Sequence, residues 1–97
     1  MKNHTRIYFE FFGYDESDWI MCEIPGCGKQ AVDIAHIDAR GMGGDPQGKK
    51  DVIENLMAKC RLCHIKYGDL PEFFEFLYSV HRKVMESFKP LFKRITE

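Results

Sequence analysis

Two pairs of cysteines constrain this sequence more than any other feature. Four residues separate Cys22 from Cys27, two residues separate Cys60 from Cys63, and the chain has no other cysteine. Each pair falls in a tight turn, so its two thiolates can point at one ion, and two such pairs complete a tetrahedral site with four thiolate ligands. We therefore predict a structural Zn²⁺ site, closed to water, which joins distant parts of the chain and stabilises a small core.

The same four cysteines could instead form two disulfides, as in a small secreted protein. That alternative needs a signal peptide, and the segment after Met1 does not resemble one, because Glu10 and Gly13 interrupt its apolar run. No window is long or apolar enough to span a membrane. We therefore expect a cytoplasmic protein, in which paired cysteines more often hold a metal than each other.

The size and charge of the chain set limits on what it can be. Its 97 residues fit a single domain, residues 1–97, and leave no room for two. The formal net charge is −1. A charge so close to zero argues against non-specific coating of DNA, which needs many phosphate contacts, but not against an enzyme that holds one phosphate.

The first half of the chain contains an aromatic segment, a strand and a loop. Residues 6–14 are rich in aromatic side chains and fit a buried strand or a short helix, since periodicity does not distinguish the two. Residues 31–37 predict a strand, with Asp33 and Ala35 on one face and the intervening side chains on the other. The glycine-rich residues 38–51 predict a loop.

The second half predicts a short strand and two helices. Residues 53–59 fit the strand, and residues 61–67 fit a short helix. A longer amphipathic helix is expected over about 70–88, with Asp69 as its N-cap and Pro90 ending it. Its apolar residues recur at steps of three and four. They are Phe73, Phe76, Leu77, Val80, Val84, Phe88 and Leu91.

The residues able to carry chemistry lie between and beside the cysteine pairs. His36 ends the first predicted strand, Asn55 follows the glycine-rich loop, and His64 directly follows the last cysteine. In this order and spacing, residues 19–68 resemble the HNH endonuclease family. The resemblance rests on Cys22-x4-Cys27, Ala35-His36-Ile37, Arg40-Gly41-Met42-Gly43-Gly44, Asn55-Leu56 and Cys60-x2-Cys63-His64.

The resemblance implies an α+β fold with a ββα-metal core, in which two short strands joined by a loop are followed by a crossing helix. The aromatic N-terminal segment and the long C-terminal helix would flank this core. In such a core His36 would be the general base, and Asn55 would hold the catalytic loop and orient the His36 ring. His64 would bind the catalytic divalent ion, Mg²⁺ or Mn²⁺, with Ni²⁺ as an alternative.

The implied activity is hydrolysis of phosphodiester bonds in DNA. A histidine side chain titrates near neutral pH and can therefore take a proton from water, while a divalent ion stabilises charge on the phosphate. One HNH centre cuts one strand at a time, so we expect nicking by a monomer. The small size resembles stand-alone HNH proteins of phages and mobile elements.

One position departs from the family pattern. The residue before the general base is commonly a metal-binding His or Asp, and here it is Ala35. Three explanations stay open: an inactive engineered variant of a parent with His at this position, a divergent site that recruits another oxygen, or a domain that only binds DNA. Asp33 is the best substitute ligand because it shares a strand face with Ala35, and Asp38 is a weaker one. Asp33 is equally well explained as a solvent-exposed acid at the edge of the strand that binds no metal.

Two basic residues, Arg40 and Lys66, are predicted to lie near a DNA phosphate. The alternative function is a non-catalytic, zinc-containing DNA-binding module, which Ala35 makes credible. A protein-interaction domain that uses the long aromatic helix is a third hypothesis, supported by that helix alone.

Overall fold

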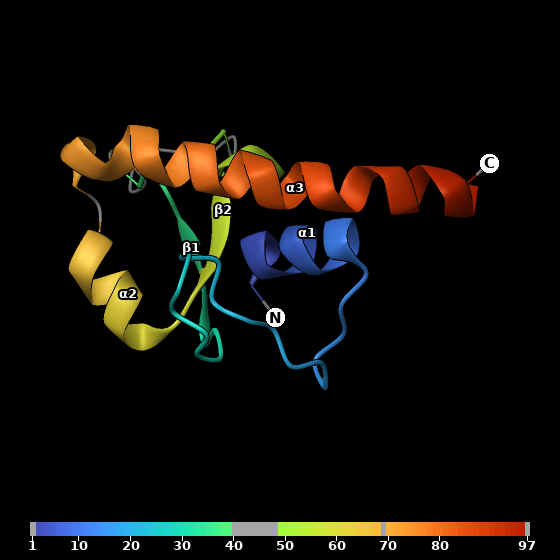
Figure 1. Ribbon diagram of the computed structural model, residues 1–97, viewed down its shortest axis with the longest axis horizontal. Helices are drawn as coiled ribbons and strands as arrows, with labels where there is room; N and C mark the ends of the chain where they lie inside the picture. Colours follow the sequence, from blue (N-terminus) through green and yellow to red (C-terminus); the bar gives the residue numbers. More distant parts are fainter. Residues whose placement is uncertain (1, 40–48, 69, 97) are drawn as a thin grey trace.

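The computed structural model describes residues 2–39, 49–68 and 70–96, which form an α+β fold. Its two strands lie between two shorter helices (Figure 1). The longest helix runs across the strands and alongside both shorter helices. Of the helices in the described ranges, none is both long and apolar enough to cross a membrane. The elements in chain order are α1 (Asn3–Phe12), β1 (Asp33–His36), the 3-10 turn η2 (Ile53–Asn55), β2 (Leu56–Lys59), α2 (Arg61–Tyr67), the 3-10 turn η3 (Pro71–Phe73) and α3 (Phe74–Thr96).

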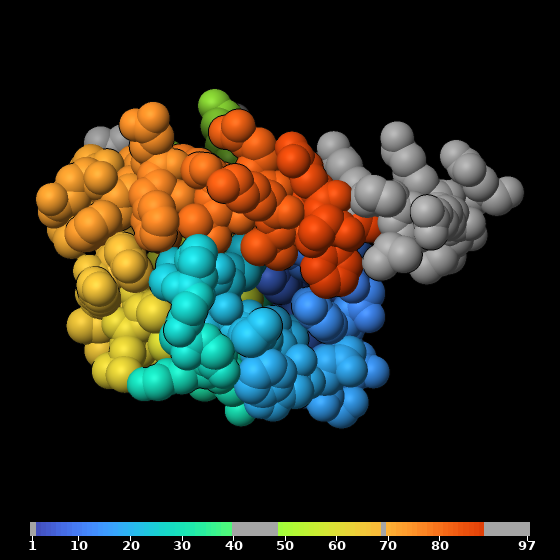
Figure 2. Space-filling model, viewed as in Figure 1, coloured from blue at the N-terminus to red at the C-terminus, as the bar shows by residue number. Residues whose placement is uncertain are grey.

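The strands β1 and β2 form an antiparallel pair, and α2 follows β2 directly, so the expected ββα order is present. The register pairs Asp33 with Lys59 and His36 with Leu56. Side chains alternate between the two faces of a strand. Asp33 accordingly meets α2, whereas His36 meets α1. Residues 20–35, drawn in light blue to teal in Figure 2, fill the face between α2 and α1.

The aromatic N-terminal segment, which the sequence left open between strand and helix, is the helix α1. Tyr8 and Phe12 are spaced by one helical turn, and both are buried in a cluster with Leu56 and Ala58 of β2. A helix places both rings on one face, where they can be buried together, which explains why this segment is a helix and not a strand. Gly13 adopts a left-handed conformation with φ of 75° and ends the helix.

The helix α3 covers two apolar clusters, one beside the cysteines and one beside α1. Leu77 is fully buried in the first, and Val84 and Phe88 pack against the second. The helix continues to Thr96, so the expected end near Phe88 is wrong. Pro90 removes one backbone hydrogen bond at a cost of roughly 3 kcal/mol, which disfavours a helix without forbidding it. The expected N-cap, Asp69, lies outside the described residues.

A buried carboxylate ties three elements together. Glu23 has a side chain only 3% exposed. Its Oε2 accepts hydrogen bonds from Tyr8 Oη at 2.5 Å and from the Ala58 backbone N–H at 3.0 Å. Its Oε1 lies 2.7 Å from His81 Nδ1, and His81 Nε2 donates to the Ile53 carbonyl at 2.6 Å. This network fixes α1 and α3 to the strand β2.

Glu23→Ala is expected to lower the free energy of unfolding by roughly 3–5 kcal/mol, because it leaves the buried His81 and Tyr8 without their acceptor. Urea denaturation followed by circular dichroism measures the change. Glu10→Ala, an exposed change on α1, is the matched control and should stay within about 0.5 kcal/mol of the parent. Equal denaturation midpoints for the two variants would show that the network adds little stability.

Candidate functional site

The four cysteines meet at one point, as their spacing predicts. Their sulfur atoms lie within 4.8 Å of one another. Sγ of Cys27 is 3.7 Å from that of Cys60 and 3.8 Å from that of Cys63. Disulfide sulfurs would lie about 2.05 Å apart. Sulfurs at about 2.3 Å from a tetrahedral ion would lie about 3.8 Å apart, so the spacing matches a four-thiolate metal site.

The turn between the first two cysteines brings their thiols together despite the four-residue spacing. Gly26 and Gly28 have φ of 78° and 68°, a left-handed conformation that costs glycine little. The Cys27 backbone N–H donates to the Ile24 carbonyl at 3.1 Å, and the Cys22 N–H donates to the Lys29 carbonyl at 2.8 Å. The Pro-Gly sequence therefore builds a tight turn with Cys22 and Cys27 on the same side.

The electrostatics of this cluster fit a bound cation. The Cys63 backbone N–H donates to Cys60 Sγ at 3.4 Å and lowers the pKa of the Cys60 thiol to about 7. Burial raises the pKa of the Cys22 and Cys63 thiols, so thiolates there need positive charge nearby. Lys59 is fully buried, and within the described part of the chain its Nζ has no hydrogen-bond partner. Burial lowers the pKa of Lys59, while the charges of Cys22 and Cys63 oppose that shift. The four cysteines could hold a metal such as zinc.

A second site is an open cleft of about 480 Å³ between the start of α1, strand β1 and helix α2. It contains both histidines and the aspartate singled out from the sequence, with Ala35 between them. The lining residues are Lys2, His4, Asp33, Ile34, Ala35, His36, Ala39, Arg61, His64, Ile65 and Gly68.

One side of the cleft is a histidine–carboxylate pair. His64 Nδ1 on α2 lies 2.9 Å from Asp33 Oδ2 on β1, and the His64 side chain is 40% exposed. Arg61, one turn earlier on α2, places a guanidinium nitrogen 3.5 Å from the other Asp33 oxygen. With Nδ1 facing a carboxylate, the ring of His64 is oriented so that Nε2 is the nitrogen left for another partner.

On the other side of the cleft, the lining residue His36 pairs with Asp51, which does not itself line the cleft. His36 Nε2 lies 2.6 Å from Asp51 Oδ1, and the second oxygen of Asp51 accepts a hydrogen bond from Asn3 Nδ2 at 3.1 Å. The hydrogen bond from His36 lowers the pKa of Asp51, which favours its anionic form. His4 packs against His36 with ring centroids 4.6 Å apart, and burial lowers the pKa of His4.

Asn55 is buried and hydrogen-bonds to residues at both ends of the loop. Its Oδ1 accepts from the Asp38 backbone N–H and from Tyr78 Oη, both at 2.9 Å. Its Nδ2 donates to the carbonyls of Asp38 and Lys50 at 3.1 and 3.0 Å. A salt bridge of 3.1 Å between Lys50 Nζ and Asp38 adds to this clamp. The arrangement suits a residue that holds the loop.

Residues 20–70 of the chain, more than half of its length, match the family model described as HNH endonuclease. The chain belongs to the HNH endonuclease family. No curated protein and no solved structure matches it. Family membership supports a nuclease-type function for the HNH segment.

Some site residues differ from the sequence predictions for this HNH chain. Arg40 lies outside the described residues. Lys66 places its Nζ over the Tyr67 ring, 5.3 Å from the centroid, and does not line the cleft, whereas Arg61 does. His4 and Asp51 were not identified from the sequence. The only feature of the sequence that could have pointed to Asp51 is that it is an acid close to Asn55. No feature of the sequence pointed to His4.

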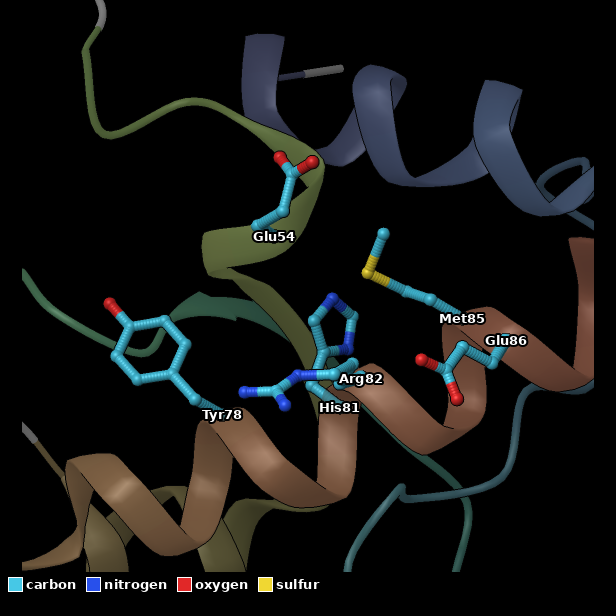
Figure 3. Close-up of a pocket in the computed structure, with 6 residues that line it drawn as sticks. All are labelled: Glu54, Tyr78, His81, Arg82, Met85 and Glu86. Carbon is cyan, nitrogen blue, oxygen red and sulfur yellow. The ribbon is translucent and has the colours of Figure 1, made fainter.

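A different hollow, of about 430 Å³, lies between η2 and α3. Figure 3 shows His81 pointing from α3 toward η2. Both of its ring nitrogens are hydrogen-bonded, to Glu23 and to the Ile53 carbonyl, so His81 serves the structural network described above. The residues lining this hollow are Glu54, Tyr78, His81, Arg82, Met85 and Glu86.

Proposed function

We propose that this HNH chain is a metal-dependent DNA endonuclease that hydrolyses phosphodiester bonds in the cleft between β1 and α2. The observation that carries the proposal is that His36 and His64 line one cleft and that each is paired with a carboxylate. His64 pairs with Asp33, which also lines the cleft, and His36 pairs with Asp51 behind it. Phosphodiester hydrolysis needs a base to activate water and a cation to stabilise charge on the phosphate. The two pairs are suited to these two tasks.

His36 is proposed as the general base. Asp51 accepts a hydrogen bond from Nε2–H, so the neutral ring carries its lone pair on Nδ1. Nδ1 then takes the proton from the attacking water, and the Asp51 carboxylate stabilises the imidazolium that results. Asn3 holds the second carboxylate oxygen, which keeps this pair in a fixed orientation.

His64 is proposed as the ligand of the catalytic ion, Mg²⁺ or Mn²⁺, with Ni²⁺ as an alternative. Bound there, the ion would act as a Lewis acid on the phosphate. Asp33 faces Nδ1 of His64, the usual position of a carboxylate that orients a metal-binding histidine, so it has a role whether or not it also binds the ion. Arg61 and Lys2 line the same cleft and are suited to contact DNA phosphates.

We further infer that the ion of the cysteine cluster is zinc, because Zn²⁺ is the usual ion of a closed tetrahedral four-thiolate site. It would be structural, since four thiolates leave no position for water. The proposed activity is nicking, because the chain contains one such cleft among its described residues.

The second candidate is a non-catalytic zinc-containing DNA-binding module. The observation that favours it is Ala35, which lines the cleft between the two pairs and offers no ligand atom. Nicking of supercoiled plasmid with Mg²⁺ or Mn²⁺ separates the two functions. A chain that shifts DNA in a gel but never nicks it, with or without a histidine at position 35, would be the binding module.

Ala35→His is expected to tighten binding of Ni²⁺ or Mn²⁺ on the order of tenfold or more and to increase nicking. The new imidazole would share the strand face of Asp33 and point into the cleft toward His64. Calorimetry and plasmid nicking measure the two effects. Val32→His is the matched control, because it adds a histidine to the same segment at an exposed position outside the cleft. If Ala35→His changes neither quantity, position 35 does not face the ion.

A further inference from the structure

Three side chains from separate parts of the chain converge at the α1 end of the cleft. His4 comes from α1, His36 from the end of β1, and Asp51 from the segment before η2. Their candidate ligand atoms lie within 4.8 Å of one another. The cluster is separate from the cysteine site, and it lies on the face of β1 opposite to the His64–Asp33 pair.

We propose that His4, His36 and Asp51 form a second divalent-metal site, selective for imidazole-binding ions such as Zn²⁺, Ni²⁺ or Co²⁺. Two imidazole nitrogens and one carboxylate oxygen are a donor set that these ions prefer and that Mg²⁺ does not. Bonds of about 2.1 Å in tetrahedral geometry put ligand atoms about 3.4 Å apart. His36 Nε2 and Asp51 Oδ1, at 2.6 Å, would separate by less than about 1 Å to admit an ion.

A neighbouring residue holds one of the three ligands in place, and the cleft leaves the two histidines accessible, as expected for a metal-binding site. Asn3 Nδ2 donates to Asp51 Oδ2, which leaves Oδ1 directed at His36, as a supporting residue does around a metal ligand. His4 and His36 both line the open cleft, so an ion can enter from solvent. Three protein ligands leave a fourth position for water.

Occupancy of this site inhibits DNA cleavage, a consequence that rests on the proposed function of His36. An ion on Nε2 takes the lone pair of that nitrogen, and the ring proton then resides on Nδ1. Nδ1–H is a hydrogen-bond donor and can no longer accept a proton from water. Zn²⁺ or Ni²⁺ in this site therefore blocks the base, while Mg²⁺ bound at His64 does not.

Calorimetry with NiCl₂ tests the site without any need for activity. The full chain with its cysteine-bound ion is titrated in a His64→Gln background, which removes the other proposed metal ligand. We expect one Ni²⁺ per chain, with affinity reduced at least about tenfold by His4→Gln and by Asp51→Asn. Glu10→Gln, an exposed change on the same helix as His4, is the control and should leave the affinity unchanged. No Ni²⁺ binding in the His64→Gln background, or binding that survives both ligand changes, would overturn the site.

The inhibition is tested by plasmid nicking at fixed Mg²⁺ with increasing NiCl₂. Each variant is compared with its own rate without Ni²⁺. We expect half-inhibition of His4→Gln to need at least about tenfold more Ni²⁺ than that of the unmodified chain. Equal sensitivity of the two would overturn the inhibitory role. Ni²⁺ binding by a chain that cuts no DNA under any condition would refute the proposed function and leave the metal site standing.

Discussion

Cys60→Ser is expected to unfold the protein, because it removes one of the four ligands of the proposed zinc ion, which would join the N-terminal half of the chain to β2 and α2. A structural zinc site contributes on the order of 10 kcal/mol of apparent folding free energy, which is comparable with the whole net stability of a domain of this size. Cys60 is 4% exposed, so a serine there also places a hydroxyl among buried thiols. The loss of stability should therefore exceed the loss expected for Glu23→Ala.

Two measurements test this expectation. Metal analysis of the purified chain should find one zinc per molecule, and circular dichroism should show cooperative melting only in the unmodified chain. Chelation of the ion should have the same effect as Cys60→Ser. Lys29→Ser changes an exposed residue of the same cysteine turn and should bind zinc normally. A chain that melts cooperatively without any metal, or that contains disulfides, would rule out the structural zinc.

The core of the HNH fold was predictable because its signals are local. The spacing of Cys60 and Cys63 and the Pro-Gly turn after Cys22 both act over a few residues, and both thiol pairs converge in the structure. Alternation along residues 31–37 correctly separated Asp33 from His36, and the structure places them on opposite faces of β1. These features depend on backbone geometry, which neighbouring residues determine.

The rest of the site depends on contacts between distant parts of the chain. His4 reaches the cleft only because Tyr8 and Phe12 dock α1 against β2, and Glu23 fixes that contact through Tyr8. These contacts join residues far apart in the chain, so the sequence of the N-terminal segment alone does not reveal them. The position of Asp51 depends on how Asn55 clamps the loop, which composition alone does not determine. The end of α3 was mispredicted because one Pro weakens a helix without ending it.

His36→Ala is expected to lower the rate of DNA cleavage by roughly 10²–10⁴-fold, the contribution of a general base. His36 sits at the end of β1 with an 11% exposed side chain, and its hydrogen bond to Asp51 is made at the edge of the cleft, outside both apolar clusters. Removing the ring therefore takes away the proton acceptor and little packing. Folding and DNA affinity should stay close to those of the parent.

Single-turnover nicking measures the rate, with thermal melting and fluorescence anisotropy as checks on folding and DNA binding. If Ala35 leaves the parent too slow to measure, the comparison is made in the Ala35→His background. Added imidazole should restore part of the lost rate, because it can occupy the space of the ring and accept the proton. A merely structural histidine would show no such rescue and would lower the melting temperature instead. Cleavage that persists undiminished in His36→Ala would mean that another group activates the water, and the inhibitory metal site would then lose its mechanism as well.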